Sequence, residues 1–303
     1  MFKRHAYCII AHNEPDIFQK LISLLDFPYN DIFVHIDKTV NIEPFKRATC
    51  NYSQIKFLQH RRRCRWGTLD MVKVELDLLK EACEFNQYNY YHILSGVDLP
   101  IKTQEYLHTL LDNNSPHYNY IGFVDNELCK DAINYRTSFY HFITRRPGDG
   151  IINSFLSFIN SLSIGVQKKI GIQRSFPFTL YKGAVWMSLT DDFCHFLINM
   201  RGTILRCFRW TRCTDEIIVQ SAFMASPFKE SLHNPTADEY TQCMREIDWD
   251  RGAPYNWRDE DYDYLMNSNK WFARKFSSDD MEIVNNIYSS LKRLERTEND
   301  SGL

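Results

Sequence analysis

Three short polar clusters in the first hundred residues have the composition of a ligand site. They are His12-Asn13-Glu14, His35-Ile36-Asp37 and Ser95-Gly96-Val97-Asp98. Each follows an apolar run that predicts a buried strand. Ligands of open parallel sheets bind beyond the carboxyl ends of the strands, so we expect the clusters to meet at one edge. Asp37 is the candidate for a nucleoside, because a carboxylate accepts hydrogen bonds from ribose hydroxyls or a base N–H; a turn role is the alternative.

Two common nucleotide motifs are missing from the chain. No GxGxxG follows the first predicted strand, and no GxxxxGK[ST] occurs anywhere. The sequence therefore argues against a dinucleotide site of the usual kind and against a P-loop NTPase.

The elements that must position these clusters alternate along the first hundred residues. Predicted strands cover residues 6–11, 31–37, 55–58 and 90–94. Apolar residues at helical spacing predict helices after Pro15 and from Leu69 to Cys83. A strand–helix–strand start predicts a right-handed crossover and parallel pairing. We therefore expect an α/β fold with a sheet covered on both faces.

The second half of the chain is less regular. It predicts a strand at 184–189, helices at 191–200 and 215–224, and a closing helix from Met281 to Leu294. Thr214 or Asp215 is the expected cap of the helix at 215–224. We expect a single domain over residues 1–295 and a disordered polar tail at 296–303.

Composition excludes several classes of protein. The 303 residues include 36 Lys+Arg and 38 Asp+Glu, a net charge of -2, with 44% hydrophobic and 24% charged residues. Such a chain is neither disordered nor built to coat nucleic acid. Nine Cys without a CxxC indicate reduced thiols rather than a zinc site or disulfide framework. The first apolar run is too short for a signal peptide, so a cytoplasmic location is expected.

Seven motifs occur in an order that resembles one family. They are Ala6-Tyr-Cys-Ile-Ile-Ala-His12, His35-Ile-Asp-Lys38, Trp66-Gly67, Leu94-Ser-Gly-Val-Asp-Leu-Pro-Ile-Lys102, Lys182-Gly-Ala-Val-Trp186, Asp215-Glu216 and Phe272-Ala-Arg-Lys-Phe276. The series resembles the core-2/I-branching β-1,6-N-acetylglucosaminyltransferase family, glycosyltransferase family 14, which also holds peptide-O-xylosyltransferases. The likeness runs over almost the whole chain.

The resemblance implies a GT-A fold with a mixed central sheet flanked by helices, a UDP-sugar donor and an inverting reaction. It also implies that no divalent metal or other cofactor is needed. Most GT-A enzymes bind a metal through Asp-x-Asp, whereas the matching place here is Ser95-Gly96-Val97-Asp98, with one carboxylate. Fixed cations must then meet the charge that develops on the leaving UDP.

Catalytic and nucleotide-binding roles also follow from the resemblance. Glu216 matches the general base, which takes the proton of the acceptor hydroxyl. A place at a helix N-terminus would favour its ionised form, and a purely structural role at that helix start is the alternative. The nucleotide-binding set is His12 and Asp37 for uridine, with Lys275 and Arg245 for the diphosphate. Arg251 and Arg274 are rivals of Arg245.

A further set is expected to contact the donor or acceptor sugar. It comprises Trp66, Gly67, Ser95, Gly96, Asp98, Trp186, Asp215 and Trp249. Packing is the alternative role for Trp186, and a hydrophobic loop anchor is the alternative for Trp249.

Two basic segments raise the question of other partners. Arg61-Arg62-Arg63-Cys64-Arg65 lacks interleaved aromatic residues, so no nucleic-acid partner is predicted. Residues 151–166 carry no charge, share an apolar helical face and are flanked by basic residues. They predict a helix with two alternative roles: it covers the sheet, or it is a surface helix that touches an anionic membrane.

The combined expectation is a cytoplasmic transferase, peripheral at the inner face of the membrane. It would move N-acetylglucosamine from a UDP-sugar to a glycan or lipid-linked glycan in polysaccharide biosynthesis. Xylose, galactose and glucose are the alternative sugars. More distant alternatives are a sulfotransferase-like enzyme and a non-catalytic glycan-binding module.

Overall fold

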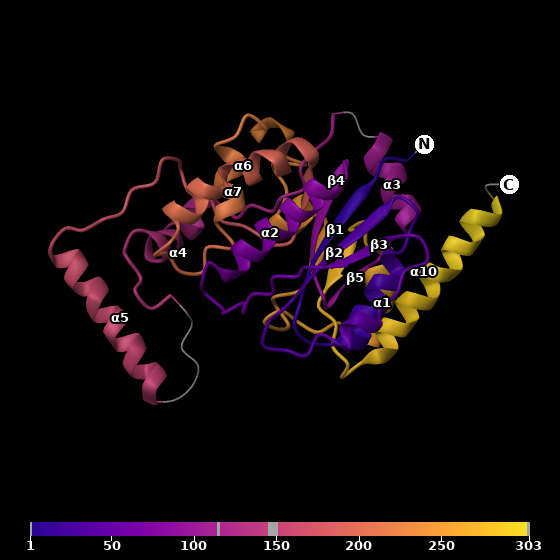
Figure 1. Ribbon diagram of the computed structural model, residues 1–303, viewed down its shortest axis with the longest axis horizontal. Helices are drawn as coiled ribbons and strands as arrows, with labels where there is room; N and C mark the ends of the chain where they lie inside the picture. The colour runs from indigo at the N-terminus through magenta and orange to yellow at the C-terminus, as the bar shows by residue number, and fades with distance from the viewer. Residues whose placement is uncertain (1, 114–115, 145–150, 302–303) are drawn as a thin grey trace.

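The computed structural model describes residues 2–113, 116–144 and 151–301 (Figure 1). Its main sheet has the strand order β3-β2-β1-β4-β6. The strands are β1 (His5–Ala11), β2 (Asn30–Ile36), β3 (Gln54–Phe57), β4 (Tyr90–Ser95) and β6 (Ser188–Thr190). The first four pair in parallel and β6 pairs antiparallel with β4, so the predicted mixed α/β architecture is confirmed.

A second, three-stranded sheet was not predicted. It has the order β5-β8-β7, formed by β5 (Asp98–Pro100), β8 (Phe272–Arg274) and β7 (Arg245–Ile247). Strand β8 runs antiparallel to β5, and this register places Asp98 opposite Arg274. Residues 176 positions apart therefore meet beside the end of β4.

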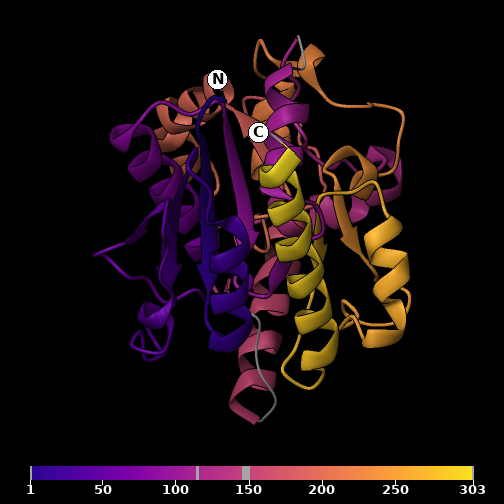
Figure 2. The ribbon, with the colours of Figure 1, turned by 90° about the vertical axis from the view of Figure 1, so that its right-hand side faces the viewer.

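Helices cover both faces of the main sheet because β1 is apolar on both sides. Ala6, Cys8 and Ile10 face one core, while Tyr7, Ile9 and Ala11 alternate toward the other. Helices α2 (Asp70–Phe85), α6 (Asp191–Cys207) and α7 (Ile218–Met224) supply the first core. Helices α1 (Pro15–Leu25), α3 (Gln104–Asn113) and α10 (Met281–Ser301) supply the second, with α1 and α10 side by side (Figures 1 and 2).

The remaining helices flank these two layers, and some add residues to the cores, such as Ile133 to the first and Leu265 to the second. They are α4 (Asn126–Thr137), α5 (Ile151–Lys169), α8 (Glu239–Gln242), α9 (Tyr262–Asn267) and the 3-10 turns η1 (Phe45–Arg47), η2 (Lys229–Ser231) and η3 (Asp259–Asp261). Helix α5 stands apart from the sheet at one end of the molecule (Figure 1). The alternative that it covers the sheet is therefore wrong.

Two predicted boundaries are also wrong. The Thr214 carbonyl accepts hydrogen bonds from both Ile217 N and Ile218 N, which closes a tight turn before α7 begins at Ile218. Neither Thr214 nor Asp215 caps that helix, and Glu216 lies in the turn. At the carboxyl end of the chain, α10 continues to Ser301 and so covers residues 296–301 of the predicted disordered tail, while 302–303 lie outside the described residues.

Candidate active site

A cavity of about 320 Å³ opens at the carboxyl ends of β1 and β2. Its wall includes five of the residues proposed from sequence: His12, Asp37, Trp66, Gly67 and Asp215. These side chains come from four separate parts of the chain. The volume lies in the range of pockets that bind small molecules and cofactors.

Backbone hydrogen bonds hold the loops of this edge together. Asp37 N donates to Ala11 O at 2.9 Å, and Gly96 N donates to Ile10 O at 2.9 Å. Gly96 allows this approach, because a Cβ at its position would lie 2.4 Å from the Cβ of Ala11. The three polar clusters after β1, β2 and β4 therefore adjoin one another, as predicted.

The Asp37 carboxylate organises the loops around it. Oδ1 accepts from Thr39 N at 2.7 Å and from Thr39 Oγ1 at 2.6 Å, and Oδ2 accepts from Cys64 N at 2.6 Å. Burial opposes ionisation, but the hydrogen bonds from Thr39 and Cys64 lower the pKa of Asp37 overall. The turn role is therefore real, and the carboxylate stays ionised in the cavity wall.

His12 contributes a neutral imidazole to the same wall. Its pKa is lowered mainly by desolvation, with Arg274 adding to the effect and Asp37 opposing it. A neutral ring offers one donor and one acceptor, which suits the polar edge of a base or ribose.

The single carboxylate of the Ser95–Asp98 turn is fully engaged. Asp98 accepts from Ser95 N at 2.7 Å and Ser95 Oγ at 2.5 Å, and it pairs with Arg274 Nη1 at 2.8 Å. Arg274 also donates to Ser95 Oγ, and its guanidinium lies 4.6 Å from the ring centroid of Trp186. Trp186 is buried, so it packs beneath Arg274.

Lys275 follows Arg274 at the end of β8. Phe276 N donates to Val97 O at 3.0 Å, which fastens this segment to the Ser95–Asp98 turn. Across the described ranges, no carboxylate oxygen lies within 4.0 Å of the Lys275 ammonium. The lysine therefore remains available for an anionic ligand.

Arg245 does not occupy the predicted place. Only 1% of it is exposed, and its guanidinium donates to Cys243 O at 2.8 Å, Met187 O at 2.9 Å and Ser188 Oγ at 3.0 Å. The cation thus ties β7 to β6 in the interior. Burial lowers its pKa to about 10. The structure does not bring Arg245 to the predicted diphosphate site, because its donors point at interior oxygens.

Glu216 lies between two cations. Its Oε2 accepts from Arg136 Nη1 at 2.7 Å and lies 3.2 Å from Lys182 Nζ. Burial opposes ionisation, yet Lys182 and Arg136 together lower the pKa of Glu216. No hydrogen bond to Oε1 comes from the part of the chain that the structure describes. One oxygen is therefore anchored while the other is open to a ligand.

Gly183 explains how Lys182 reaches Glu216. Gly183 N donates to Glu216 O at 2.9 Å, and a Cβ on Gly183 would lie 1.8 Å from Gly122 O. Only glycine fits this crossing of two backbones.

Asp215 lines the cavity, and its pKa is shifted in the opposite direction to that of Glu216. Burial, followed by the neighbouring Glu216 charge, raises its pKa to about 6. Glu75 of α2 is buried nearby, and desolvation together with Asp215 raises the pKa of Glu75 well above its ordinary value. Three carboxyl groups with different proton affinities thus stand at one edge of the sheet.

Comparison with known proteins decides the family. The family model described as "Branch: Core-2/I-Branching enzyme" matches residues 5–272. The chain belongs to the core-2/I-branching enzyme family. This core-2/I-branching enzyme is therefore a glycosyltransferase, with a nucleotide-sugar donor and a glycan acceptor as its substrates. Membership also supports the GT-A assignment of its mixed sheet.

Other comparisons add little. No curated protein matches this core-2/I-branching enzyme. One similar solved structure is the crystal structure of mouse xyloside xylosyltransferase 1 in its apo form, at 10% identity. The match covers 88% of this chain and 97% of that one, with a TM-score of 0.35. Such a low score carries no argument about activity.

The structure does not bring Trp249 to the cavity. It is 53% exposed and lines a separate hollow of about 500 Å³ with Asp248, Arg251 and Tyr264. Arg251 there pairs with Asp248 at 2.5 Å and with Asp261 at 2.8 Å. Of the two rivals to Arg245, only Arg274 lies beside the predicted cleft.

Sequence reasoning missed Arg136, Lys182 and Glu75. Lys182 opens the Lys-Gly-Ala-Val-Trp motif, so its position was visible although its contact with Glu216 was not. Arg136 and Glu75 carry no local signal, because their roles depend on contacts across the fold.

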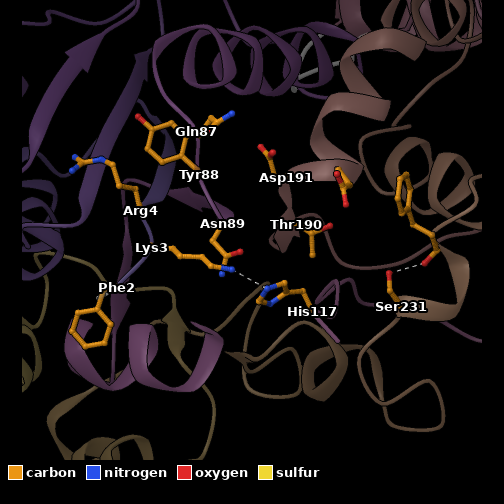
Figure 3. A pocket seen from close by; sticks show the side chains of 12 residues that line it. Phe2, Lys3, Arg4, Gln87, Tyr88, Asn89, His117, Thr190, Asp191 and Ser231 are labelled. Atoms are coloured by element: carbon orange, nitrogen blue, oxygen red, sulfur yellow. Dashed lines mark hydrogen bonds between the residues drawn. The ribbon is translucent and has the colours of Figure 1, made fainter. Parts of the chain in front are cut away.

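A larger hollow lies at the opposite edge of the sheet. It has a volume of about 700 Å³ and is lined by residues before β1 and β4, such as Lys3 and Asn89, and by His117 (Figure 3). His5, His108 and Asp112 form the single group with metal-ligand geometry among the described residues, and they too lie near this edge. Neither feature adjoins the strand ends where ligands of such sheets bind.

Among the described residues, no helix combines the length and the apolar character needed to cross a bilayer.

Proposed function

We propose that this enzyme is an inverting, metal-independent transferase that moves N-acetylglucosamine from a UDP-sugar to a hydroxyl of a glycan or lipid-linked glycan. The observation that supports it most directly is the cavity beyond β1 and β2. His12 and Asp37 line one side, Asp215 lines another, and Glu216 follows next in the chain. The choice of sugar rests on the resemblance to N-acetylglucosaminyltransferases.

The uridine occupies the cavity in this proposal. The cavity volume of about 320 Å³ suits a nucleoside better than a whole nucleotide-sugar, so the diphosphate extends along the rim of the cavity. His12 and the ionised Asp37 supply donor and acceptor atoms for the base and ribose.

Lys275 supplies the positive charge that meets the diphosphate in this proposal, and Arg274 lies beside it. The Asp98 carboxylate, in the position where related enzymes hold a metal, pairs with Arg274 at 2.8 Å. A neutral pair of this kind leaves the Lys275 charge uncompensated by protein. The uncompensated Lys275 cation, a few ångströms from a phosphate, is worth about 2–4 kcal/mol at an effective dielectric near 20. Arg274, whose charge Asp98 balances, takes the place of Arg245 as a hydrogen-bond donor to the diphosphate.

The chemical step is a single displacement. The acceptor oxygen attacks C1 of the sugar while Oε1 of Glu216 takes its proton. The bond from C1 to the β-phosphate oxygen breaks, and its electron pair leaves with UDP. Attack opposite to the leaving group inverts C1. Arg136 and Lys182 hold Oε2, which fixes the orientation of the base.

A UDP-sugar hydrolysis assay tests the proposal, because it reports the donor without the acceptor. We expect release of UDP from UDP-N-acetylglucosamine above that from UDP-xylose, UDP-galactose and UDP-glucose. The rate should be unchanged in EDTA, since protein cations meet the diphosphate. Glu216→Gln protein in the same assay is the control for contaminating hydrolases. A rate abolished by EDTA and restored by Mn²⁺ would overturn the metal-independent mechanism.

A further inference from the structure

Helix α5 presents its apolar side to solvent. Phe155, Phe158, Ile159, Leu162 and Val166 recur at i, i+3, i+4, i+7 and i+11, which places them on one helical face. All five are exposed, with Phe155 at 61%, Phe158 at 63% and Leu162 at 57%. We call these five residues the α5 stripe.

The opposite side of α5 is the one that packs on the protein. Asn160 and Gln167 are buried, although both are polar, together with Ile164. Gln167 Oε1 accepts from Tyr140 N at 2.8 Å, and Gln167 Nε2 donates to Tyr140 O at 2.9 Å. A polar contact therefore fixes the helix so that the α5 stripe faces outward. This is the reverse of a helix that covers a core.

The α5 stripe is larger than the scattered exposed side chains of ordinary surfaces. It also continues past the helix end to Ile170, which is 63% exposed. Contiguous apolar surface of this kind marks an interaction site.

The charge of this region indicates what covers the stripe. From residue 132 to residue 190 the only acidic residue is Asp149. The same segment contains seven basic residues: Arg136, Arg145, Arg146, Lys168, Lys169, Arg174 and Lys182. Arg136 and Lys182 pair with Glu216, which leaves five for the surroundings of α5. Lys168 and Lys169 are exposed at the end of α5. A second copy of this segment would be repelled by like charge, whereas anionic lipid head groups would be attracted.

We propose that α5 docks on an anionic lipid surface, with the α5 stripe in the boundary between head groups and acyl chains. Phenylalanine and leucine on one face with lysine beside them are the composition of helices that lie in that boundary. Long lysine side chains reach the head groups while their stems stay with the apolar layer.

Docking through α5 would bring the candidate catalytic carboxylate to the membrane surface. Arg136 of α4 binds Glu216, and Tyr140, four residues further on, binds Gln167 of α5. The helix and the base are thus linked through one short segment. The inference that the catalytic base lies at the membrane rests on the proposed function. It favours a lipid-linked acceptor over a soluble one.

Vesicle flotation with the full chain tests the docking without any substrate. We expect binding to vesicles of phosphatidylcholine with phosphatidylglycerol and none to phosphatidylcholine alone. The double variant Phe158→Ser, Leu162→Ser should bind the vesicles at least roughly tenfold more weakly than the wild type. Each substitution removes apolar surface that docking would bury. Lys168→Glu with Lys169→Glu should weaken binding to the anionic vesicles by a similar factor.

Leu294→Ser is the matched control. Leu294 is 47% exposed on α10, at the far side of the molecule from α5 (Figure 1). Its variant should float like the wild type, and thermal melting should show all variants folded. Equal binding by the stripe variant would overturn the proposal. A second result would also overturn it: the wild type does not bind vesicles and is a dimer, and the stripe variant is a monomer. UDP affinity, measured in parallel, separates this failure from a failure of the proposed function.

Discussion

Asp215 and Glu216 are adjacent in sequence, but their environments separate their proton affinities. Glu216 is paired with Lys182 and Arg136, while the half-buried Asp215 has no cation in ion-pair contact among the described residues. A pair of titratable groups divided in this way indicates distinct chemical roles.

The acidic limb of the pH–rate profile shows which of these two carboxyl groups is the general base. If Glu216 is the base, kcat should fall only below pH 4.5, because its pKa is lowered from that value. If Asp215 is the base, the fall should occur near pH 6, where its pKa lies. Glu216→Gln should reduce kcat by at least ~10²-fold, while UDP binding is kept. Asp215→Asn is the comparison: a larger loss in that variant, with a limb at pH 6, would transfer the role to Asp215.

Lys275 is the residue on which diphosphate binding most depends. Lys275→Ala should weaken UDP binding by roughly tenfold or more in calorimetry, given about 2 kcal/mol for one fixed cation. Lys46→Ala, at an exposed lysine paired with Glu43, controls for the loss of a surface charge. Unchanged UDP affinity in Lys275→Ala would reassign the role to Arg274 alone.

At the scale of elements, the site depends on close backbone crossings. The Lys182–Trp186 segment passes Gly122 at Gly183, and this crossing places Lys182 beside Glu216. Helix α6 contains Gly202, where an added Cβ meets no atom within 4 Å.

These two glycines form a matched pair of substitutions. Gly183→Ala should destabilise the fold by about 1–3 kcal/mol or more, because its methyl group overlaps Gly122 O. Gly202→Ala should stabilise by about 0.5–1 kcal/mol through helix propensity alone. Urea unfolding of both variants measures the difference. Equal stabilities would show that the backbones at Gly183 separate without cost.

At the scale of the whole molecule, Glu75 couples stability to pH. It is 3% exposed on α2, and Oε1 has no hydrogen-bond partner among the described residues. Its folded-state pKa is raised by desolvation and by Asp215. The folded chain therefore keeps a proton that the unfolded chain releases above about pH 4.5, and stability falls as pH rises from there toward the folded pKa.

Glu75→Gln removes this dependence. The free energy of unfolding of the variant, relative to the wild type, should increase between pH 5 and pH 8 by up to about 1.4 kcal/mol per unit. Urea unfolding across that range measures it. Glu81→Gln, on the exposed side of the same helix, should give a curve parallel to the wild type. A parallel curve for Glu75→Gln would contradict the raised pKa.

The local pattern of the sequence determined the sheet and the edge where the site forms. Strands β1, β2 and β4 were predicted because apolar runs report burial directly, and parallel order then places His12, Asp37 and Ser95 at adjoining strand ends. The ordered motifs also predicted the family, which the match over residues 5–272 confirms.

Only the tertiary structure decided which charges are free and which side of a helix faces water. Arg245 and Arg274 are both arginines near short strands, yet one is sealed among carbonyl groups and the other pairs with Asp98. The periodicity of α5 predicts an apolar stripe, but its outward direction follows from the contact of Gln167 with Tyr140. Ion pairing and burial arise between residues distant in sequence, and local composition therefore does not specify them.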